Sequence, residues 1–302
     1  MRRALLLFSA LFMVSVAGCN TTANYDESDG YMPLEVTYGE HAVIDLQAGE
    51  FIGKEDLAGR MAESDVVFVG ESHEFALGHR AEHMLLQVMN SSTGTVAVSL
   101  EMFERDVQDH VNDYLSGRIT EREFLKNSRP WGNYLRDYKP LVEYARRNNL
   151  PVIASNIPRR LAGKFAMAGY KGLTEQERKW VAREHYAPDG EYKERFRKTM
   201  EAMQAHGRGM GRGKMNIDML FKAQAIKDDT MAEAIVEHIR SSEMPVIHFC
   251  GSFHSDYGLG TVERVKRLMP ELNVLVIKLA QEPGRVEKPF EGIDKAVADL
   301  YI

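Results

Sequence analysis

The stretch Val66-Val67-Phe68-Val69-Gly70-Glu71-Ser72-His73-Glu74 decides how this chain folds. Its four apolar residues run directly into a glycine, which is typical of a parallel strand that is covered on both faces. Glu71 and His73 follow where such a strand leaves its sheet, at the edge that borders the binding crevice in open α/β folds. A carboxylate and an imidazole at that edge are suited to acid–base or metal chemistry. The alternative is that they form only the first turn of an ordinary helix.

Four further apolar runs have the character of core strands: Thr95–Leu100, Pro151–Ser155, Pro245–Cys250 and Asn273–Leu279. Helical patterns lie between them, and this alternation predicts crossover helices that join parallel strands. A stripe at i, i+4 spacing predicts a helix behind the second strand, formed by Phe103, Val107, Val111 and Leu115. The sequence therefore predicts an α/β fold with a mostly parallel central sheet flanked by helices.

The segment between the third and fourth predicted strands is too long for one crossover helix. We therefore expect a helical insertion at about 174–215, followed by a long helix from about 216 to 241 that returns to the sheet. Thr174 and Glu177 fit the capping box that begins many helices, and Thr120 and Glu123 fit it too. Each threonine is therefore predicted to begin a helix.

The first 18 residues have the architecture of a bacterial secretory signal. Two arginines precede an apolar run that is too short to span a membrane as a helix. The run ends in Val16-Ala17-Gly18-Cys19, which resembles a lipobox and implies lipidation of Cys19. Asn20 resembles an outer-membrane sorting signal. We expect an outer-membrane lipoprotein held by its lipid anchor, with a flexible tether at 19–35 and an α/β domain at 36–302.

Removal of the signal changes the charge balance of the chain. Loss of Arg2 and Arg3 leaves 36 basic and 44 acidic side chains, a net charge of −8. This excess of negative charge argues against a nucleic-acid partner. Cys250 alone would remain as a free thiol after Cys19 is lipidated, so no internal disulfide is expected. Its apolar neighbours predict a buried, inert thiol.

Polar or glycine-rich residues follow each of the first four predicted strands. Because the carboxyl ends of parallel strands share one edge, these residues are expected to converge there. They could hold a metal, a polarised water or an anionic group. Alternatively, Glu101 forms a half-buried ion pair with Arg159 or Arg105. The residues concerned are Glu71 and His73, Glu101, Arg159, and His254.

Two histidines lie four residues apart on the helix that follows the first strand. His79 and His83 would share one helix face and could chelate a metal. The zincin pattern requires Glu directly after the first histidine, and Arg80 stands there instead. An equally good interpretation is that both histidines are exposed on the helix and have no function.

Several short motifs, taken in order, resemble the ChaN-like haem-binding family of the Tiki superfamily, which has distant erythromycin-esterase-type relatives. The resemblance covers about residues 40 to 280. It implies a periplasm-exposed lipoprotein that binds haem, often between two protomers, and acts in haem or iron acquisition. In the wider superfamily, the equivalents of Glu71, His73 and His254 are catalytic. The motifs are Gly70–His73, Glu101–Phe103, Trp131–Tyr138, Ala154–Arg159, Gln224–Ala232 and Gly251–His254.

The sequence therefore leaves two interpretations of the function open. In the first, the protein binds haem non-covalently, since no Cys-x-x-Cys-His motif is present. Trp131, Tyr134 and Tyr138 would form an aromatic patch that stacks on the porphyrin, with Tyr134 or Tyr138 as iron ligand. If neither serves, Tyr186, Tyr257 or the helix histidines are next. The alternative for the patch is ordinary packing under a neighbouring helix.

In the second function, the protein is a metal-dependent hydrolase. Glu71 would act as general base, while His73 and His254 would bind a divalent metal or transfer protons. Glu101 and Arg159 would orient groups or stabilise charge. A serine-hydrolase mechanism is not supported because the chain has no Gly-x-Ser-x-Gly elbow.

Overall fold

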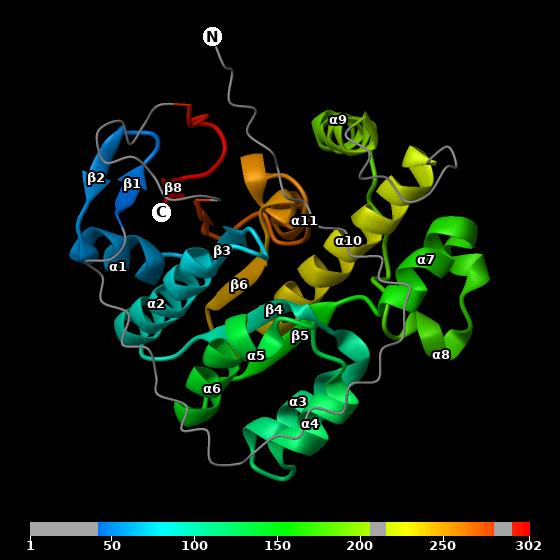
Figure 1. Ribbon diagram of the computed structural model, residues 1–302, viewed down its shortest axis with the longest axis horizontal. Coiled ribbons are helices and arrows are strands. Elements are labelled where there is room, and N and C mark those ends of the chain that lie inside the picture. The colour runs from blue at the N-terminus through cyan, green and yellow to red at the C-terminus, as the bar shows by residue number, and fades with distance from the viewer. Residues whose placement is uncertain (1–41, 206–215, 281–291) are drawn as a thin grey trace.

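An eight-stranded sheet organises the protein, as the computed structural model shows (Figure 1). The structure describes residues 42–205, 216–280 and 292–302. The predicted signal, Cys19, the tether and residues 206–215 of the insertion lie outside these ranges. The order of the strands is β2-β1-β8-β7-β3-β6-β4-β5.

All five predicted strands are present at the centre and one side of this sheet, and they run parallel to one another. The predicted fold class is confirmed. These strands are β3 (Val66–Glu71), β4 (Ala97–Glu104), β5 (Val152–Asn156), β6 (Val246–Gly251) and β7 (Val274–Lys278).

Three short strands at the other side were not predicted. They are β1 (Val43–Asp45), β2 (Glu50–Ile52) and β8 (Leu300–Tyr301). β8 pairs parallel with β7, while β1 pairs antiparallel with both β8 and β2. Runs of two or three residues carry no alternating pattern long enough to identify a strand.

Helices cover both faces of the sheet. Val67 and Val69 of β3 belong to one apolar cluster, while Val66 and Phe68 belong to a second cluster on the opposite face. This alternation follows from the two-residue period of a strand. Helices contributing to the first cluster are α1 (Lys54–Ala62), α2 (Ala76–Thr93), α3 (Gln108–Leu115), α4 (Glu121–Ser128), α5 (Tyr134–Asp137) and α6 (Lys139–Arg147). Those contributing to the second are α10 (Ile217–Ser242) and α11 (Thr261–Leu268).

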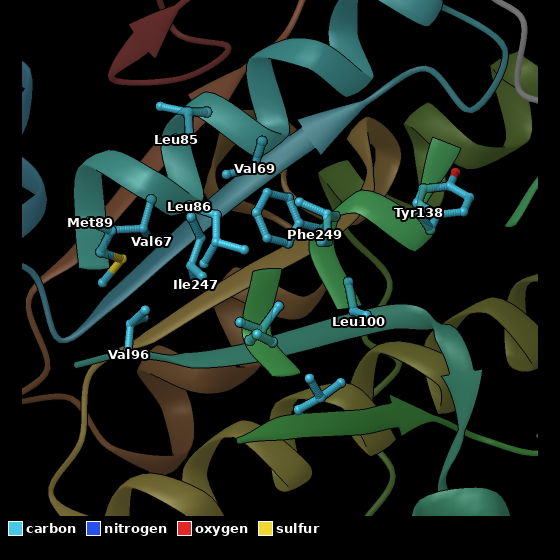
Figure 2. Close-up of a cluster of buried hydrophobic side chains, with 14 of the residues drawn as sticks. Val67, Val69, Leu85, Leu86, Met89, Val96, Leu100, Tyr138, Ile247 and Phe249 are labelled. Atoms are coloured by element: carbon cyan, nitrogen blue, oxygen red, sulfur yellow. The ribbon is translucent and has the colours of Figure 1, made fainter. Parts of the chain in front are cut away.

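Figure 2 shows the core of the first cluster, where side chains of α2 interdigitate with those of β3, β4 and β6. Leu85, Leu86 and Met89 are fully buried there. Removing such side chains from water contributes roughly 1.5–3 kcal/mol each. The Tyr138 ring lies at one end of the same cluster (Figure 2). The apolar core therefore fixes α2 and α5 against the carboxyl end of β3.

Helices α7 (Arg159–Ala168), α8 (Glu175–Arg178), α9 (Glu191–Ala205) and α10 lie between β5 and β6. The long helix is as predicted, since α10 begins at Ile217 and ends at Ser242. Both predicted capping boxes are confirmed: Thr120 accepts the Glu123 amide, and Thr174 accepts the Glu177 amide. Across the described ranges, no helix combines the length and apolar character needed to cross a bilayer.

The boundary after the second predicted strand was wrong. β4 continues to Glu104, and its register against β5 shifts between Leu100 and Glu104. Glu101 therefore lies inside the strand, and Phe103 is not part of the helix stripe, because α3 begins only at Gln108. The strand thus continues four residues past Leu100, where the predicted run ended.

Candidate functional site

Glu71, the last residue of β3, is the centre of the first half of the site. Its carboxylate is buried, and its Oε1 accepts a hydrogen bond from the Tyr138 hydroxyl at 2.7 Å. The same oxygen lies 2.6 Å from His73 Nδ1. Ser72 and His73 leave the sheet in a turn, and α2 begins at Ala76. The strand end and α5 together hold this carboxylate in one orientation.

His79 and Glu82, one turn apart on α2, extend this half of the site. His79 Nδ1 lies 2.9 Å from Glu82 Oε2 and 3.3 Å from Glu71 Oε2. On the other side of the ring, His79 Nε2 lies 3.2 Å from the His73 carbonyl oxygen and 3.6 Å from Asp137 Oδ2. All these groups except His73 are buried. Glu71, His79 and Glu82 therefore present ligand atoms within 4.8 Å of one another.

The predicted aromatic patch packs inside the protein and does not form a platform on its surface. Trp131 is half-buried and makes an edge contact with His73, with ring centroids 4.8 Å apart. Tyr138 is fully buried, and Tyr134 is 2% exposed and packs against Phe103 and Phe124. An iron at the Tyr138 oxygen would have to displace the bond to Glu71.

Glu101 and His254 form the second half of the site. Glu101 Oε2 accepts the Gly251 amide at 2.8 Å, and Glu101 Oε1 lies 3.3 Å from His254 Nε2. His254 Nδ1 lies 2.6 Å from Asp228 Oδ1, so the imidazole is held between two carboxylates. Asp228 also accepts hydrogen bonds from the hydroxyls of Thr261 and Tyr192.

Gly251, at the end of β6, brings the two halves together. A Cβ on this residue would lie 2.9 Å from His73 Nε2 and 3.6 Å from Glu101 Oε2. The side chains of His73 and Glu101 therefore pack against the same glycine. We call the group of Glu71, His73, Glu101 and His254 the rim, because all four lie at the carboxyl edge of the parallel strands.

The rim carries charges that burial alone would suppress. Burial disfavours a charged His254, yet Glu101 and Asp228 outweigh it and raise the pKa of this imidazole to about 10. Burial likewise opposes charging of Glu101, but His254 and His73 hold the pKa of this carboxyl well below its usual range. Glu71 similarly outweighs burial and raises the pKa of His73. At neutral pH His254 is therefore protonated, and it faces the ionised carboxylate of Glu101.

The structure does not bring every predicted site residue to the rim. His83 is buried on α2, where its ring meets Tyr144 edge-on, with ring centroids 5.6 Å apart. Arg159 is exposed at the start of α7, and its backbone amide donates to Glu104. Arg105 pairs with Glu233 and Glu237, which are not part of the rim. Cys250 is fully buried, and burial raises the pKa of its thiol.

Sequence reasoning missed the helix residues that complete each half. Asp137 and Glu82 lie beside His79, while Asp228 and Gln224 lie beside His254. Gln224 and Asp228 are four residues apart on α10, so their common face was a usable signal. Glu82 stands three residues after His79 and offered a similar signal.

The chain matches the family described as haem-binding uptake, Tiki superfamily, ChaN over residues 57–265. The chain belongs to this family. The matched span begins in α1 and ends in α11, so it contains the whole rim and the helix residues that complete each half of the site.

A solved ChaN structure from Campylobacter jejuni, whose subject is cofacial haem binding, has the same fold. It is 18% identical, the match covers 86% of this chain and 95% of that one, and the TM-score is 0.64. An erythromycin esterase in its open conformation is 11% identical, with 79% of this chain and 77% of that chain covered and a TM-score of 0.47.

Among curated proteins, the chain is 24% identical over 253 residues to RETICULATA-RELATED 5, a chloroplastic protein of Arabidopsis thaliana. The match covers 77% of this chain but only 33% of that protein. The chain thus spans about a third of the length of this relative.

Proposed function

We propose that this protein binds haem non-covalently. The observation that carries the proposal is the family match, which extends from α1 to α11 and includes the complete rim. The fold shared with a ChaN protein over nearly all of that protein's length supports it. A haem held without thioether bonds needs an axial ligand from the protein, and a tyrosine oxygen is one of the established choices.

The geometry changes the order of the ligand candidates. Tyr134 and Tyr138 remain the sequence-based choice, but both are buried, and the Tyr138 hydroxyl already donates to Glu71. Tyr257 and Tyr186 are half-buried, so their rings reach the surface in part. Of these two, Tyr257 lies in the short 3-10 turn Asp256–Gly258, three residues after His254 of the rim.

Two further features favour Tyr257 as the iron ligand. Its backbone φ of 63° lies in the left-handed region, which is unfavourable for a bulky side chain and concentrates at functional sites. The Arg195 guanidinium lies over its ring, 3.4 Å from the centroid. Burial raises the pKa of Tyr257, but Arg195 opposes that shift and would stabilise a phenolate. We therefore rank Tyr257 first among the accessible phenols.

The test is a hemin titration of the purified protein, followed by absorption spectra of three single variants. Tyr257→Phe is expected to lose the phenolate-type spectrum, while Tyr134→Phe and Tyr138→Phe keep it. Loss in Tyr138→Phe alone would restore the sequence-based choice. Because ferrous iron prefers softer ligands than a phenolate, reduction should release the haem from the unmodified protein.

We also propose that the protein is an outer-membrane lipoprotein anchored through Cys19. The support is the signal architecture that ends in Val16-Ala17-Gly18-Cys19. Cys19→Ala is expected to move the protein into the soluble fraction or leave its signal uncleaved. Unchanged processing and unchanged membrane partition would refute the anchor.

Such an anchored haem binder would act in haem or iron acquisition, with haem bound at the interface between two protomers of a homodimer. Sedimentation of the purified protein with and without hemin tests the dimer. Growth of a deletion strain with hemin as its sole iron source tests the role: slower growth supports it, and unchanged growth contradicts it.

The second candidate function is a metal-dependent hydrolase, which the convergence of Glu71, His73, Glu101 and His254 favours. The charges at the rim limit that chemistry. His254 is protonated at neutral pH, and both of its nitrogens face carboxylates, so metal ligation there would displace one of these contacts. Ester or peptide hydrolysis by the unmodified protein that depends on added metal would support this function over haem binding alone. The same activity should disappear in Glu71→Gln.

A further inference from the structure

Two buried carboxylates lie beside the His79 imidazole on the α2 side of the rim, and each has one oxygen without a hydrogen-bond partner. These oxygens are Glu71 Oε2 and Glu82 Oε1, on residues that are 2% and 0% exposed. Leaving a buried carboxylate oxygen without a donor is costly, and a bound cation is one way in which native proteins satisfy such an atom.

The spacing of the ligand atoms suits a single small cation. Bonds of about 2.0–2.1 Å in tetrahedral geometry place neighbouring ligand atoms about 3.3 Å apart. His79 Nδ1 lies 3.3 Å from Glu71 Oε2 and 2.9 Å from Glu82 Oε2, and the full set falls within 4.8 Å. Only small side-chain adjustments would bring all three onto one ion.

The surrounding residues orient these ligands as the outer shell of a metal site does. His79 Nε2 faces the His73 carbonyl oxygen and Asp137 Oδ2, which fixes its proton on that nitrogen and leaves Nδ1 to face the carboxylates. Glu71 Oε1 is occupied by Tyr138 and His73, so only Oε2 points to His79. Glu71 and His79 thus each have one polar atom held by a neighbour, while Glu82 Oε2 faces His79 Nδ1.

We propose that Glu71, His79 and Glu82 form a binding site for a divalent transition-metal ion of the Zn²⁺ or Mn²⁺ class. We call these three residues the α2 triad. One imidazole nitrogen and two carboxylate oxygens suit these ions, which leave further positions for water. The ion would take the place of the proton that His79 Nδ1 otherwise shares with Glu82. This site lies apart from His254 and needs no bound haem, so it does not rest on the proposed haem function.

The experiment uses purified full-length protein without a histidine tag, dialysed against Zn²⁺ or Mn²⁺ and then freed of unbound metal by gel filtration. We expect about one equivalent of metal per chain and a rise in Tm of at least about 5 °C. His79→Gln and Glu82→Gln should lose both effects. His83→Gln is the matched control, since His83 is a buried histidine one turn further along α2, and it should keep both.

Metal retained at full stoichiometry in folded His79→Gln and Glu82→Gln would overturn the proposal, as would unmodified protein that binds no stoichiometric metal. If either variant fails to fold, X-ray absorption of the zinc-loaded unmodified protein decides. A shell with one imidazole and otherwise oxygen ligands supports the α2 triad. A shell with two imidazoles would mean that a second histidine, such as His73 or His254, binds the metal. That result would overturn the proposal.

Discussion

Gly251 sets how closely the two halves of the rim approach each other. Its φ of −57° is one that any residue adopts, so the need for glycine here is steric. The missing side chain leaves room for the His73 ring on one side and the Glu101 carboxylate on the other. The rim therefore depends on the absence of a single methyl group.

Gly251→Ala is expected to push the His73 ring away from Glu71 and to cost about 1–3 kcal/mol of folding free energy. Gly163→Ala on the exposed face of α7 is the control, because nothing lies within 4 Å of the added methyl group. That control should gain about 0.5–1 kcal/mol from helix propensity. Urea unfolding of the two variants measures both effects, and equal stabilities would contradict the packing described for Gly251.

His248 makes stability depend on pH through its burial. This fully buried ring bonds to Ser99, and burial lowers its pKa from 6.5 to about 3. Below pH 6.5 the unfolded chain protonates this residue while the folded protein does not. The unfolded state then binds more protons, so stability falls as the pH falls from 6.5 towards 3.

We expect this residue to remove about 1.4 kcal/mol of stability for each pH unit below 6.5. Denaturant titrations at pH 7.5 and pH 5, for the unmodified protein and for His248→Gln, measure the difference. The variant should lose less stability between the two values. Equal losses would show that His248 is protonated inside the folded protein.

At the scale of elements, α10 supplies the group that keeps His254 charged. Asp228 is buried and accepts hydrogen bonds from three neighbours: His254, Thr261 and Tyr192. The helix is held in place by apolar contacts with the sheet, through residues such as Ile235 and Val236. Packing of the helix therefore determines the electrostatics of the rim.

Asp228→Asn keeps the shape of this side chain but removes its charge from a buried ion pair. We expect a loss of about 3–5 kcal/mol, because the buried imidazolium loses one of its two counter-charges. Asp218→Asn at the exposed start of α10 should change stability by less than about 0.5 kcal/mol. Thermal unfolding of both variants at neutral pH is the measurement. A loss no larger for Asp228→Asn than for Asp218→Asn would contradict the charged state of His254.

The elements differ in how far sequence alone could predict them. β3, β6 and the other central strands are apolar runs bounded by polar residues or glycine, so they were recognisable. The rim residues were recognisable too, because parallel strands deliver their carboxyl ends to one edge. Asp228, Glu82 and Asp137 come from helices. Their spacing indicates which residues share a helix face, but it does not show that this face turns towards the site, because the rotation of a helix depends on tertiary packing.

At the scale of the whole molecule, the fold places two polar clusters side by side at the carboxyl edge of the parallel strands. One is fixed by α2 and α5, the other by α10 and the turn after β6. The aromatic segment Trp131–Tyr138 illustrates the limit of sequence reasoning at this scale. Its residues are spaced like a surface patch, but the apolar cluster beneath α5 buries two of the three rings.

Hemin binding by the purified protein tests the central claim most directly. We predict a saturable Soret absorbance change at micromolar hemin, with about one haem per protomer at the endpoint and the spectrum of a phenolate-ligated ferric haem. The same titration of unfolded protein in denaturant is the control for adsorption to exposed apolar segments. Absorbance that rises in proportion to hemin without saturating, or that is unchanged by unfolding, would contradict the account.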